Sequence, residues 1–523
     1  MAIRMEKDDP QDGGRRPDRP SNGGGMNLGK LLPFILLFVF KRPKIGIPIL
    51  LIAGFWYFFL GGDQFFSSSP AATDDSLNAA DYSLGASFDQ AKYDTAQVYA
   101  SLATSFGSYS LPPRYTLEQY APKRQHQGKQ GSCVGWASAY SARTILQARA
   151  TGQDPDRIAF SPSYLYNQIH LTGCEGAYML DAMKAMRQNG AVPFSEFPYT
   201  ERSCSNYPQS SIINRGKQFT IKGYTRLTKG ANNYQVDIPA IKQHLAQGAP
   251  VVIGMMVGGT FMSRMMGQKV WQPSNRDYSQ SGFGGHAMTV IGYDDNYAGG
   301  SFQIMNSWGE QWGDRGLFWV RYKDFEHFTR EAYGLHPMGS VEDRAKYDDS
   351  KMAVEFGLLN VEQKATIPLS QINNTTFRTA QPLSKGEKFK VLIANSIECY
   401  MYVFGQESDG SSTVLFPYTQ KHSAYCGITG TRLFPQDYSM VPDEVGNRDY
   451  IAIVISKEEI DYRTFNYELN RSRQANYEGK LQAAMSKVKP IPGVRFQAGN
   501  TITFEADRRG QDAVGMIIEV DKR

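Results

Sequence analysis

The 523-residue sequence lacks the features that mark several simple classes of protein. Five cysteines are too few for a fold built on disulfides, and the 50 glycines follow no Gly-X-Y period, which excludes collagen. The sequence shows neither internal repeats nor heptads. The net charge of +5 is local, because residues 1–44 hold nine Lys and Arg against five Asp and Glu. The chain therefore has no basic domain, and nucleic-acid binding loses its main support.

The composition fits a folded protein of more than one domain. Hydrophobic residues make up 41% of the chain and charged residues 20%, and it holds 29 Phe and 30 Tyr. This apolar content excludes a wholly disordered chain. A length of 523 residues predicts roughly two or three domains.

Two apolar stretches follow a polar start rich in Gly and Arg. Residues 31–40 are about half as long as a helix that crosses a bilayer, whereas residues 45–62 form an uncharged run with an aromatic cluster. Lys41, Arg42 and Lys44 separate the stretches, and charges at a bilayer centre are unfavourable. We predict a transmembrane helix over 45–62, preceded by a disordered, basic cytoplasmic tail, residues 1–44.

This arrangement predicts a single-pass membrane protein whose later residues face the periplasm or the exterior. Three alternatives stay open. A cleaved signal peptide fits less well, because the tail is long and no A-x-A-like site follows directly. A membrane hairpin with residues 31–40 as its first leg would keep the rest of the chain in the cytosol. A buried core helix is the third interpretation of residues 45–62.

Beyond the predicted span the sequence divides into three parts. Residues 63–110 begin rich in Ser, Ala and Asp, so we expect a spacer or a pro-segment there. Residues 111–337 are dense in Gly and aromatics and predict a globular domain, and a charged stretch follows it. Residues 352–523 predict a β-rich accessory domain with one helical run, 468–488, and strand-like runs at 389–404, 450–456, 501–504 and 514–520.

The sharpest motif is QGKQGSCVGWA, residues 127–137, in which a glycine-rich loop leads into a helix-like stretch that ends near Ala150. Cys133 falls at the expected start of that helix. The helix dipole and free N–H groups there favour a thiolate, and a lowered thiol pKa makes a cysteine nucleophilic at neutral pH. A buried, unreactive thiol is the competing interpretation of Cys133 taken alone.

Two further segments supply the partners that a nucleophilic cysteine needs. His286 stands in GGHAMTVIGY, residues 284–293, which predicts a strand with an accessible imidazole. A neutral imidazole beside a thiol can accept its proton. Asn306 begins NSWGEQWGDRG, residues 306–316, and its amide can hold the other ring nitrogen and fix the tautomer. Taken separately, these residues read more readily as a structural histidine and a turn residue.

Together these segments resemble the papain-like cysteine peptidases over residues from about 111 to 322. The resemblance implies that Cys133 is the nucleophile, His286 the general base and acid, and Asn306 the residue that orients it. It also implies that Gln127 donates to the oxyanion and that Trp308 shields the His–Asn bond. The implied fold is α+β, with a helical lobe bearing the cysteine, a β-rich lobe bearing the histidine and asparagine, and a cleft between them.

The sequence departs from the family pattern at a few positions. Val134 follows the cysteine where a tryptophan is usual, and Gly285 stands where many relatives carry an acid. An alternative register would align Gln130 with the family glutamine and put Trp136 at the nucleophile position, which describes an inactive protein. That register loses the match at Gln127 and is rejected.

A wall of the substrate cleft is implied by GCEGAY, residues 173–178, which resembles the family's G-C-x-G-G segment. Gly176, Ala177 and Tyr178, together with Trp308, are thereby expected to bind substrate. Tyr178 and Met179 suggest an apolar second subsite.

Four cysteines remain for disulfides. Cys174 and Cys204 could close a loop of about 30 residues, worth roughly 3–4 kcal/mol, and two unpaired thiols are the alternative. Cys399 and Cys426 could form a second bridge in the C-terminal domain. That domain resembles a small β-domain of unassigned function attached to bacterial peptidases and kinases. We expect it to bind or scaffold a protein partner, or to pack as a structural appendage, and it shows no metal-ligand spacing.

The sequence therefore predicts a membrane-anchored thiol endopeptidase that hydrolyses peptide bonds through a cysteine thioester, without a metal or an organic cofactor. Its expected partners are a peptide or protein substrate and the membrane, through one N-terminal helix, but not nucleic acid. Two alternatives stay open. One is a catalytically silent peptide-binding protein, and the other is an acyl transferase or transpeptidase that uses the same thioester.

Overall fold

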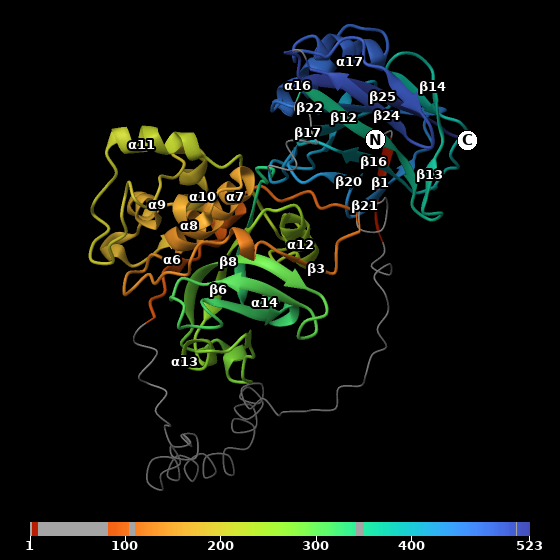
Figure 1. The fold of residues 1–523 in the computed structure, drawn as a ribbon. Coiled ribbons are helices and arrows are strands. Elements are labelled where there is room, and N and C mark those ends of the chain that lie inside the picture. The colour runs from red at the N-terminus through yellow and green to blue at the C-terminus, as the bar shows by residue number, and fades with distance from the viewer. Residues whose placement is uncertain (1–2, 9–81, 104–109, 341–349, 509) are drawn as a thin grey trace, which may run out of the picture. The chain divides into compact units, whose positions relative to one another are not determined.

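The computed structural model describes residues 3–8, 82–103, 110–340, 350–508 and 510–523 (Figure 1). Within these ranges no helix is both long and apolar enough to cross a membrane. The predicted span, residues 45–62, lies outside the described residues. The predicted α+β domain and the β-rich region after it are both confirmed.

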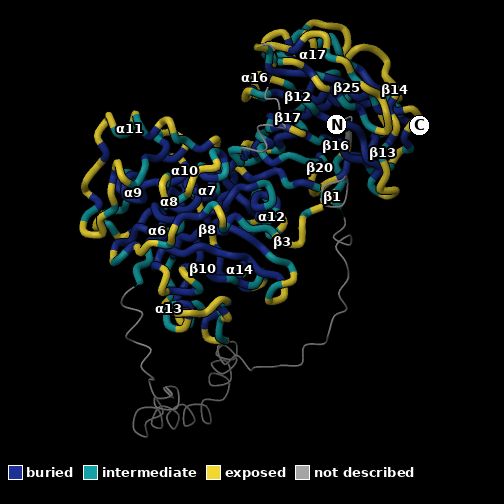
Figure 2. The backbone as a smooth tube through the Cα atoms, in the orientation of Figure 1, coloured by how far each residue is buried: buried dark blue, intermediate teal, exposed yellow. Residues whose placement is uncertain are grey.

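The helical half of the α+β domain is built around one long, continuous helical rod. The rod starts as α6 (Cys133–Gly135), continues as a π-helix (Trp136–Arg143) and ends as α7 (Thr144–Thr151). It is buried along almost its whole length (Figure 2). Small residues permit this, since a Cβ on Gly135 would lie 2.7 Å from the carbonyl oxygen of Pro162. The helices of this half also include α8 (Pro155–Ile158), α9 (Pro162–Ile169), α10 (Met179–Gln188) and α11 (Ser210–Gly216).

The other half is a mixed sheet with strand order β5-β11-β6-β8-β9-β10-β7, and β3 pairs with β8. The strand β8 (Gly284–Asp294) lies near the middle and carries His286. Its neighbour β9 (Ser301–Met305) ends immediately before Asn306, so the sheet brings these two residues toward each other. The other elements are β3 (Arg114–Thr116), β5 (Tyr224–Arg226), α12 (Ile238–Ala246), β6 (Val251–Val257), α13 (Thr260–Ser263), β7 (Val270–Trp271), β10 (Leu317–Arg321), α14 (Tyr322–Phe328) and β11 (Thr329–Leu335).

The C-terminal domain is a sandwich of two sheets, with strand orders β1-β21-β16-β12-β24-β23 and β14-β15-β25-β22-β17-β18. Alternation along β17 (Cys399–Gln406) explains its layers. Met401 and Val403 are buried in the core shared by the two sheets, whereas Tyr402 and Phe404 pack under α16 (Tyr462–Arg471) and α17 (Tyr477–Met485). Each face of the strand therefore has its own apolar cover, which is why the run is continuously hydrophobic.

The remaining strands of the sandwich complete these two sheets. The first sheet holds β12 (Lys351–Asn360), β13 (Ala365–Ile367), β16 (Phe389–Asn395), β20 (Gly430–Phe434), β21 (Tyr438–Pro442), β23 (Phe496–Ala498) and β24 (Ile502–Asp507). The second holds β14 (Leu369–Gln371), β15 (Thr376–Thr379), β18 (Ser412–Phe416), β19 (Tyr425–Cys426), β22 (Arg448–Ser456) and β25 (Ala513–Asp521).

The first residues of the chain form an edge strand of the C-terminal domain. The strand β1 (Ile3–Lys7) pairs antiparallel with β21 (Tyr438–Pro442). Met5 packs on the sandwich core, and Asp8 forms an ion pair of 2.6 Å with Lys390. Glu6 likewise pairs with Lys388 at 3.7 Å. The prediction of a disordered tail is therefore wrong for these residues, because their side chains have partners in the C-terminal domain.

Candidate active site

Cys133 lies at the start of α6 and is completely buried. Its Sγ accepts a hydrogen bond of 3.4 Å from the backbone N–H of Ala287. The sequence predicts a lowered thiol pKa here, and the structure contradicts this expectation. Burial raises the pKa of Cys133 to about 12, and backbone N–H groups offset only part of that effect. The thiol is therefore neutral in this state.

His286 and Asn306 meet as the sequence predicts. His286 Nε2 lies 2.7 Å from Asn306 Oδ1, which also accepts from the backbone N–H of Ser307 at 2.8 Å. Because Oδ1 only accepts, the imidazole proton sits on Nε2, which leaves the lone pair on Nδ1. Trp308 stacks on the imidazole, with ring centroids 4.4 Å apart, and so covers the bond. Burial lowers the pKa of His286 to about 4, so the ring is also neutral.

The side-chain amide of Gln127 is held by three hydrogen bonds within the chain. Its Oε1 accepts from the hydroxyl of Ser307 at 2.6 Å, which orients the amide and leaves Nε2 as the donor. Nε2 donates to the carbonyl oxygens of Gln130 and Ser83, each at 3.0 Å. The donor that the sequence assigns to a substrate oxyanion thus binds a carbonyl of the chain itself.

The carbonyl of Ser83 belongs to residues 82–88, which we call the cleft segment. Tyr82 stacks on Trp308 with ring centroids 4.8 Å apart, and the indole N–H of Trp308 donates to Ser83 at 3.3 Å. Further along, the backbone N–H of Gly85 donates to the carbonyl of Gly285 at 3.1 Å. The sequence predicts a spacer or a pro-segment for residues 63–110. The spacer interpretation is wrong for this part, because it lies against the residues of the candidate site.

The predicted substrate wall pairs with the same segment. The strand β4 (Ala177–Tyr178) pairs parallel with β2 (Ala86–Ser87), and Ala177 N–H donates to the carbonyl of Gly85 at 2.9 Å. Three glycines allow this close approach. A Cβ on Gly85 would lie 2.0 Å from the carbonyl oxygen of Gly131, and one on Gly176 would lie 2.6 Å from that of Gly85.

Phe88 packs beside this wall against Met179, one of the two residues to which the sequence assigns an apolar second subsite. A Cβ on Gly254 would lie 2.5 Å from the Phe88 ring and 2.6 Å from the Met179 methyl group. Glu331 lies on β11 as the Cα partner of Gly254, and its side chain is also buried. Tyr333 donates to it at 3.2 Å, and burial raises the pKa of Glu331 to about 8. Sequence reasoning missed Phe88 and Glu331, since neither lies in a motif.

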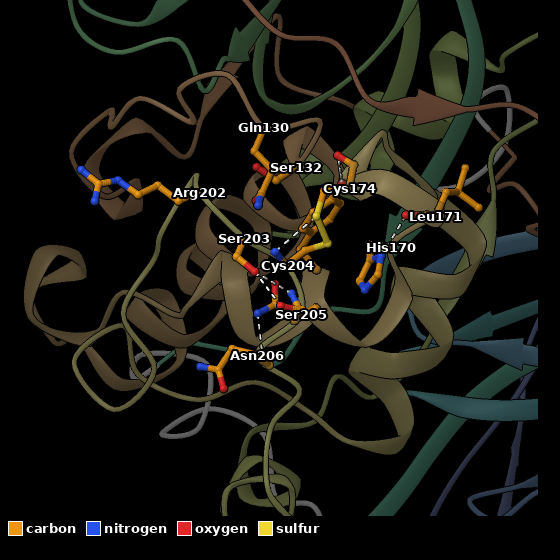
Figure 3. Close-up of a disulfide and its surroundings, with 12 residues drawn as sticks. Gln130, Ser132, His170, Leu171, Cys174, Arg202, Ser203, Cys204, Ser205 and Asn206 are labelled. Carbon is orange, nitrogen blue, oxygen red and sulfur yellow. Dashed lines mark hydrogen bonds between the residues drawn. A yellow bond between two sulfur atoms is a disulfide. The ribbon is translucent and has the colours of Figure 1, made fainter.

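The cysteines outside the site divide into one bridge and two free thiols. Cys174 and Cys204 form the predicted disulfide, which Figure 3 shows beside the loop bearing Ser203 and Ser205. The second possible bridge, between Cys399 and Cys426, is not formed. The two residues face each other across β17 and β19, but both thiols are free and buried in the apolar sandwich core, where the neutral form is favoured. Among the described residues, no group of three His, Cys, Asp or Glu side chains could hold a metal ion.

Comparison with known proteins agrees with this geometry. The sequence profile "Papain family cysteine protease" matches residues 116–335, and a "Domain of unknown function (DUF4384)" matches residues 383–459. An uncharacterized peptidase C1-like protein of Acanthamoeba polyphaga mimivirus is 28% identical over 246 residues, covering 45% of this chain and 76% of that protein.

Two cathepsins and one solved structure extend the comparison. Cathepsin B-like CP2 of Giardia intestinalis and mouse cathepsin K are each 27% identical, covering 38% and 39% of this chain but only 63% and 56% of those proteins. The crystal structure of xylellain, a cysteine protease from Xylella fastidiosa, is 22% identical, with a TM-score of 0.41 over 50% of this chain and 97% of that one. Residues 116–335 therefore form a papain-family cysteine protease domain.

Proposed function

We propose that the chain is a thiol endopeptidase with Cys133, His286, Asn306 and Gln127 as catalytic residues, and that its cleft segment holds it latent. The observation that carries this proposal is the 2.7 Å contact between His286 Nε2 and Asn306 Oδ1. It leaves Nδ1 as the proton acceptor, and Nδ1 has no hydrogen-bond partner among the described residues. The thiol lies 3.4 Å from the N–H of Ala287, the residue next to that imidazole.

The proposed reaction follows from these positions. The thiol of Cys133 gives its proton to His286 Nδ1, and the sulfur attacks the peptide carbonyl to form a thioester. His286 then protonates the leaving amine, and water hydrolyses the thioester. Gln127 Nε2 donates to the oxygen that becomes negative, and one such donor is worth about 2.7–4 kcal/mol of barrier.

Latency is supported by the two perturbed pKa values. With the pKa of Cys133 raised to about 12 and that of His286 lowered to about 4, neither the thiolate nor the imidazolium forms near pH 7. Both shifts arise chiefly from burial, and residues 82–88 contribute to that burial. Departure of the cleft segment would readmit water, lower the thiol pKa and raise the imidazole pKa.

The test is covalent labelling of the full chain by an irreversible peptidyl epoxide, combined with hydrolysis of a peptide library. We expect slow labelling of the wild type, none of Cys133→Ala, and normal labelling of Cys426→Ala, which removes a buried free thiol of the C-terminal domain. Activity should follow labelling. A chain that stays unlabelled even when the cleft segment has been displaced would be a silent peptide-binding protein. Ligation to added amines that exceeds hydrolysis would make it a transferase.

We also propose that residues 45–62 anchor the chain in a membrane and that the catalytic part is exported. The disulfide between Cys174 and Cys204 supports export, because such bonds persist in oxidising compartments. The pairing of β1 with β21 constrains the topology. A single crossing would require β1 to leave that sheet, whereas a hairpin of residues 31–40 and 45–62 would keep both ends on one side.

Reporter fusions at the two termini test this topology in intact cells. Export with a single crossing predicts a C-terminal reporter outside and an N-terminal reporter inside. Two reporters on the same side would overturn the single crossing and favour the hairpin. A cytosolic C-terminal reporter would overturn export.

A further inference from the structure

Residues 94–103, which we call the bridging segment, begin at the last residue of α5 (Gln90–Asp94), after the cleft segment, and bind both domains. On one edge, Val98 donates its N–H to the carbonyl of Lys421 at 2.6 Å and accepts from the N–H of Ser423 at 3.1 Å. On the other edge, Arg226 at the end of β5 exchanges two hydrogen bonds, of 2.8 and 3.0 Å, with the residues flanking Val98. The segment therefore lies as a short strand between the peptidase sheet and a loop of the C-terminal domain.

Charged side chains reinforce this arrangement at its first residue. The carboxylate of Asp94 accepts from Arg226 at 3.2 Å and from Tyr234 at 2.8 Å, both in the peptidase domain. It also accepts from Lys421 of the C-terminal domain. The hydrogen bond from Lys421 is the main cause that lowers the pKa of Asp94 to about 2. The carboxylate is thus charged at any pH near neutrality and is shared by two domains.

The end of the bridging segment is held by a buried arginine. Arg432, on β20, donates Nε to the carbonyl of Ala100 at 2.9 Å, and the neighbouring Thr431 accepts from the N–H of Ala103 at 2.8 Å. The other nitrogens of Arg432 are bound within the C-terminal domain, to Asn395 at 2.9 Å and to a carbonyl at 2.7 Å. The guanidinium is therefore prepositioned by its own domain to bind this segment.

We propose that residues 421–432 of the C-terminal domain form a binding surface for the bridging segment and thereby keep the cleft segment in the active site. This inference rests on the proposed function, in which residues 82–88 block the cleft. It gives the domain of unknown function a specific role, as the anchor of an inhibitory segment of its own chain. A cut anywhere before Tyr82 would leave the block attached through residues 94–103.

The size of the effect follows from tether length. While Asp94 is held, only the few residues of α5 separate the cleft segment from a fixed point. Release of the bridging segment alone leaves α5 on the peptidase domain, where Tyr93 is buried and Lys92 pairs with Asp181 at 3.2 Å. Only when these contacts are lost as well is β3, which starts at Arg114, the next fixed point, and the tether is then about five times longer. Effective concentration falls as about the 3/2 power of tether length, so full release would lower the occupancy ratio of the cleft segment roughly tenfold.

The experiment measures epoxide labelling of Cys133 in the full chain carrying Val98→Pro or Lys421→Met. Val98→Pro removes the N–H that faces Lys421 and leaves the two hydrogen bonds to Arg226 in place. Lys222→Met is the matched control, because its ion pair with Glu398 also joins the domains but does not involve the segment. The two lysine pairs are equally exposed, with side chains 37% and 25% accessible for Lys421 and Asp94 and 40% and 23% for the control.

We expect labelling to rise for each test variant, by at most about tenfold for the two combined, while the control labels like the wild type. Where Gly85→Ala has already opened most of the population, neither variant should add anything. If Gly85→Ala accelerates labelling but Val98→Pro and Lys421→Met do not, the anchor is refuted and the latent enzyme stands. If Gly85→Ala has no effect either, the latency itself is refuted.

Discussion

A single methyl group at Gly85 should open the active site. A Cβ there would lie 2.0 Å from the carbonyl oxygen of Gly131 and 2.4 Å from its carbonyl carbon, both of them backbone atoms that cannot rotate away. Overpacking of this kind costs about 1–3 kcal/mol, and 1.4 kcal/mol changes an equilibrium tenfold. Gly85→Ala should therefore lower the ratio of closed to open cleft by a factor of roughly 5 to 150.

The assay is the rate at which an irreversible epoxide labels Cys133, followed by mass spectrometry of the intact chain. When the closed state dominates, this rate is proportional to the open fraction, so it should rise by the same factor. Gly230→Ala is the control, because a Cβ at that position meets only Asn233 Cβ, at 3.8 Å. An unchanged rate in Gly85→Ala, with Gly230→Ala and the wild type alike, would refute the claim that the segment closes the cleft.

Three further changes test Phe88, the buried acid and the disulfide. Phe88→Ala removes the ring that packs against Met179 and should speed epoxide labelling several-fold, whereas Phe496→Ala, a half-buried ring of the sandwich, should not. Folded Glu331 keeps its proton up to about pH 8, whereas the carboxyl of the unfolded chain loses it above its ordinary pKa of 4.5. This residue therefore makes the free energy of unfolding fall as the pH rises between those two values. In denaturant unfolding at pH 5 and pH 8, Glu331→Gln should remove that decline, which is about 1.4 kcal/mol per pH unit. An equal decline in the wild type and in the variant would contradict this. Replacing Cys174 and Cys204 by serine should lower the unfolding free energy by about 3 kcal/mol, and a midpoint insensitive to reductant would oppose this.

The candidate catalytic residues could be found from sequence because their chemistry restricts both residue type and order. Cys133, His286 and Asn306 each stand in a motif whose local pattern predicts the correct element, a helix start, a strand and a turn after a strand. Their protonation could not be predicted in the same way. It depends on burial by residues 82–88, which carry no motif and reach the site only because Gly85, Gly131 and Gly176 are all small.

The C-terminal domain shows a similar division. Continuous β-branched and aromatic runs predict its strands, although the run 389–404 is two strands and the run 468–488 covers the end of α16 and all of α17. The pairing of strands could not be predicted, since it depends on contacts remote in sequence. The strand β1 was missed because its alternating pattern, with Met5 inward and Arg4 exposed, is short and lies in a polar, glycine-rich tail.

That first strand also bears on how the protein can be produced. Five residues at the very start of the chain cover the outer edge of β21, which is synthesised more than four hundred residues later. A shortened form that omits residues 1–81 to avoid the apolar stretches would leave this edge bare, and an unprotected edge invites chains to pair with one another. Aggregation of such a form would then result from the loss of β1 rather than from the absence of a membrane.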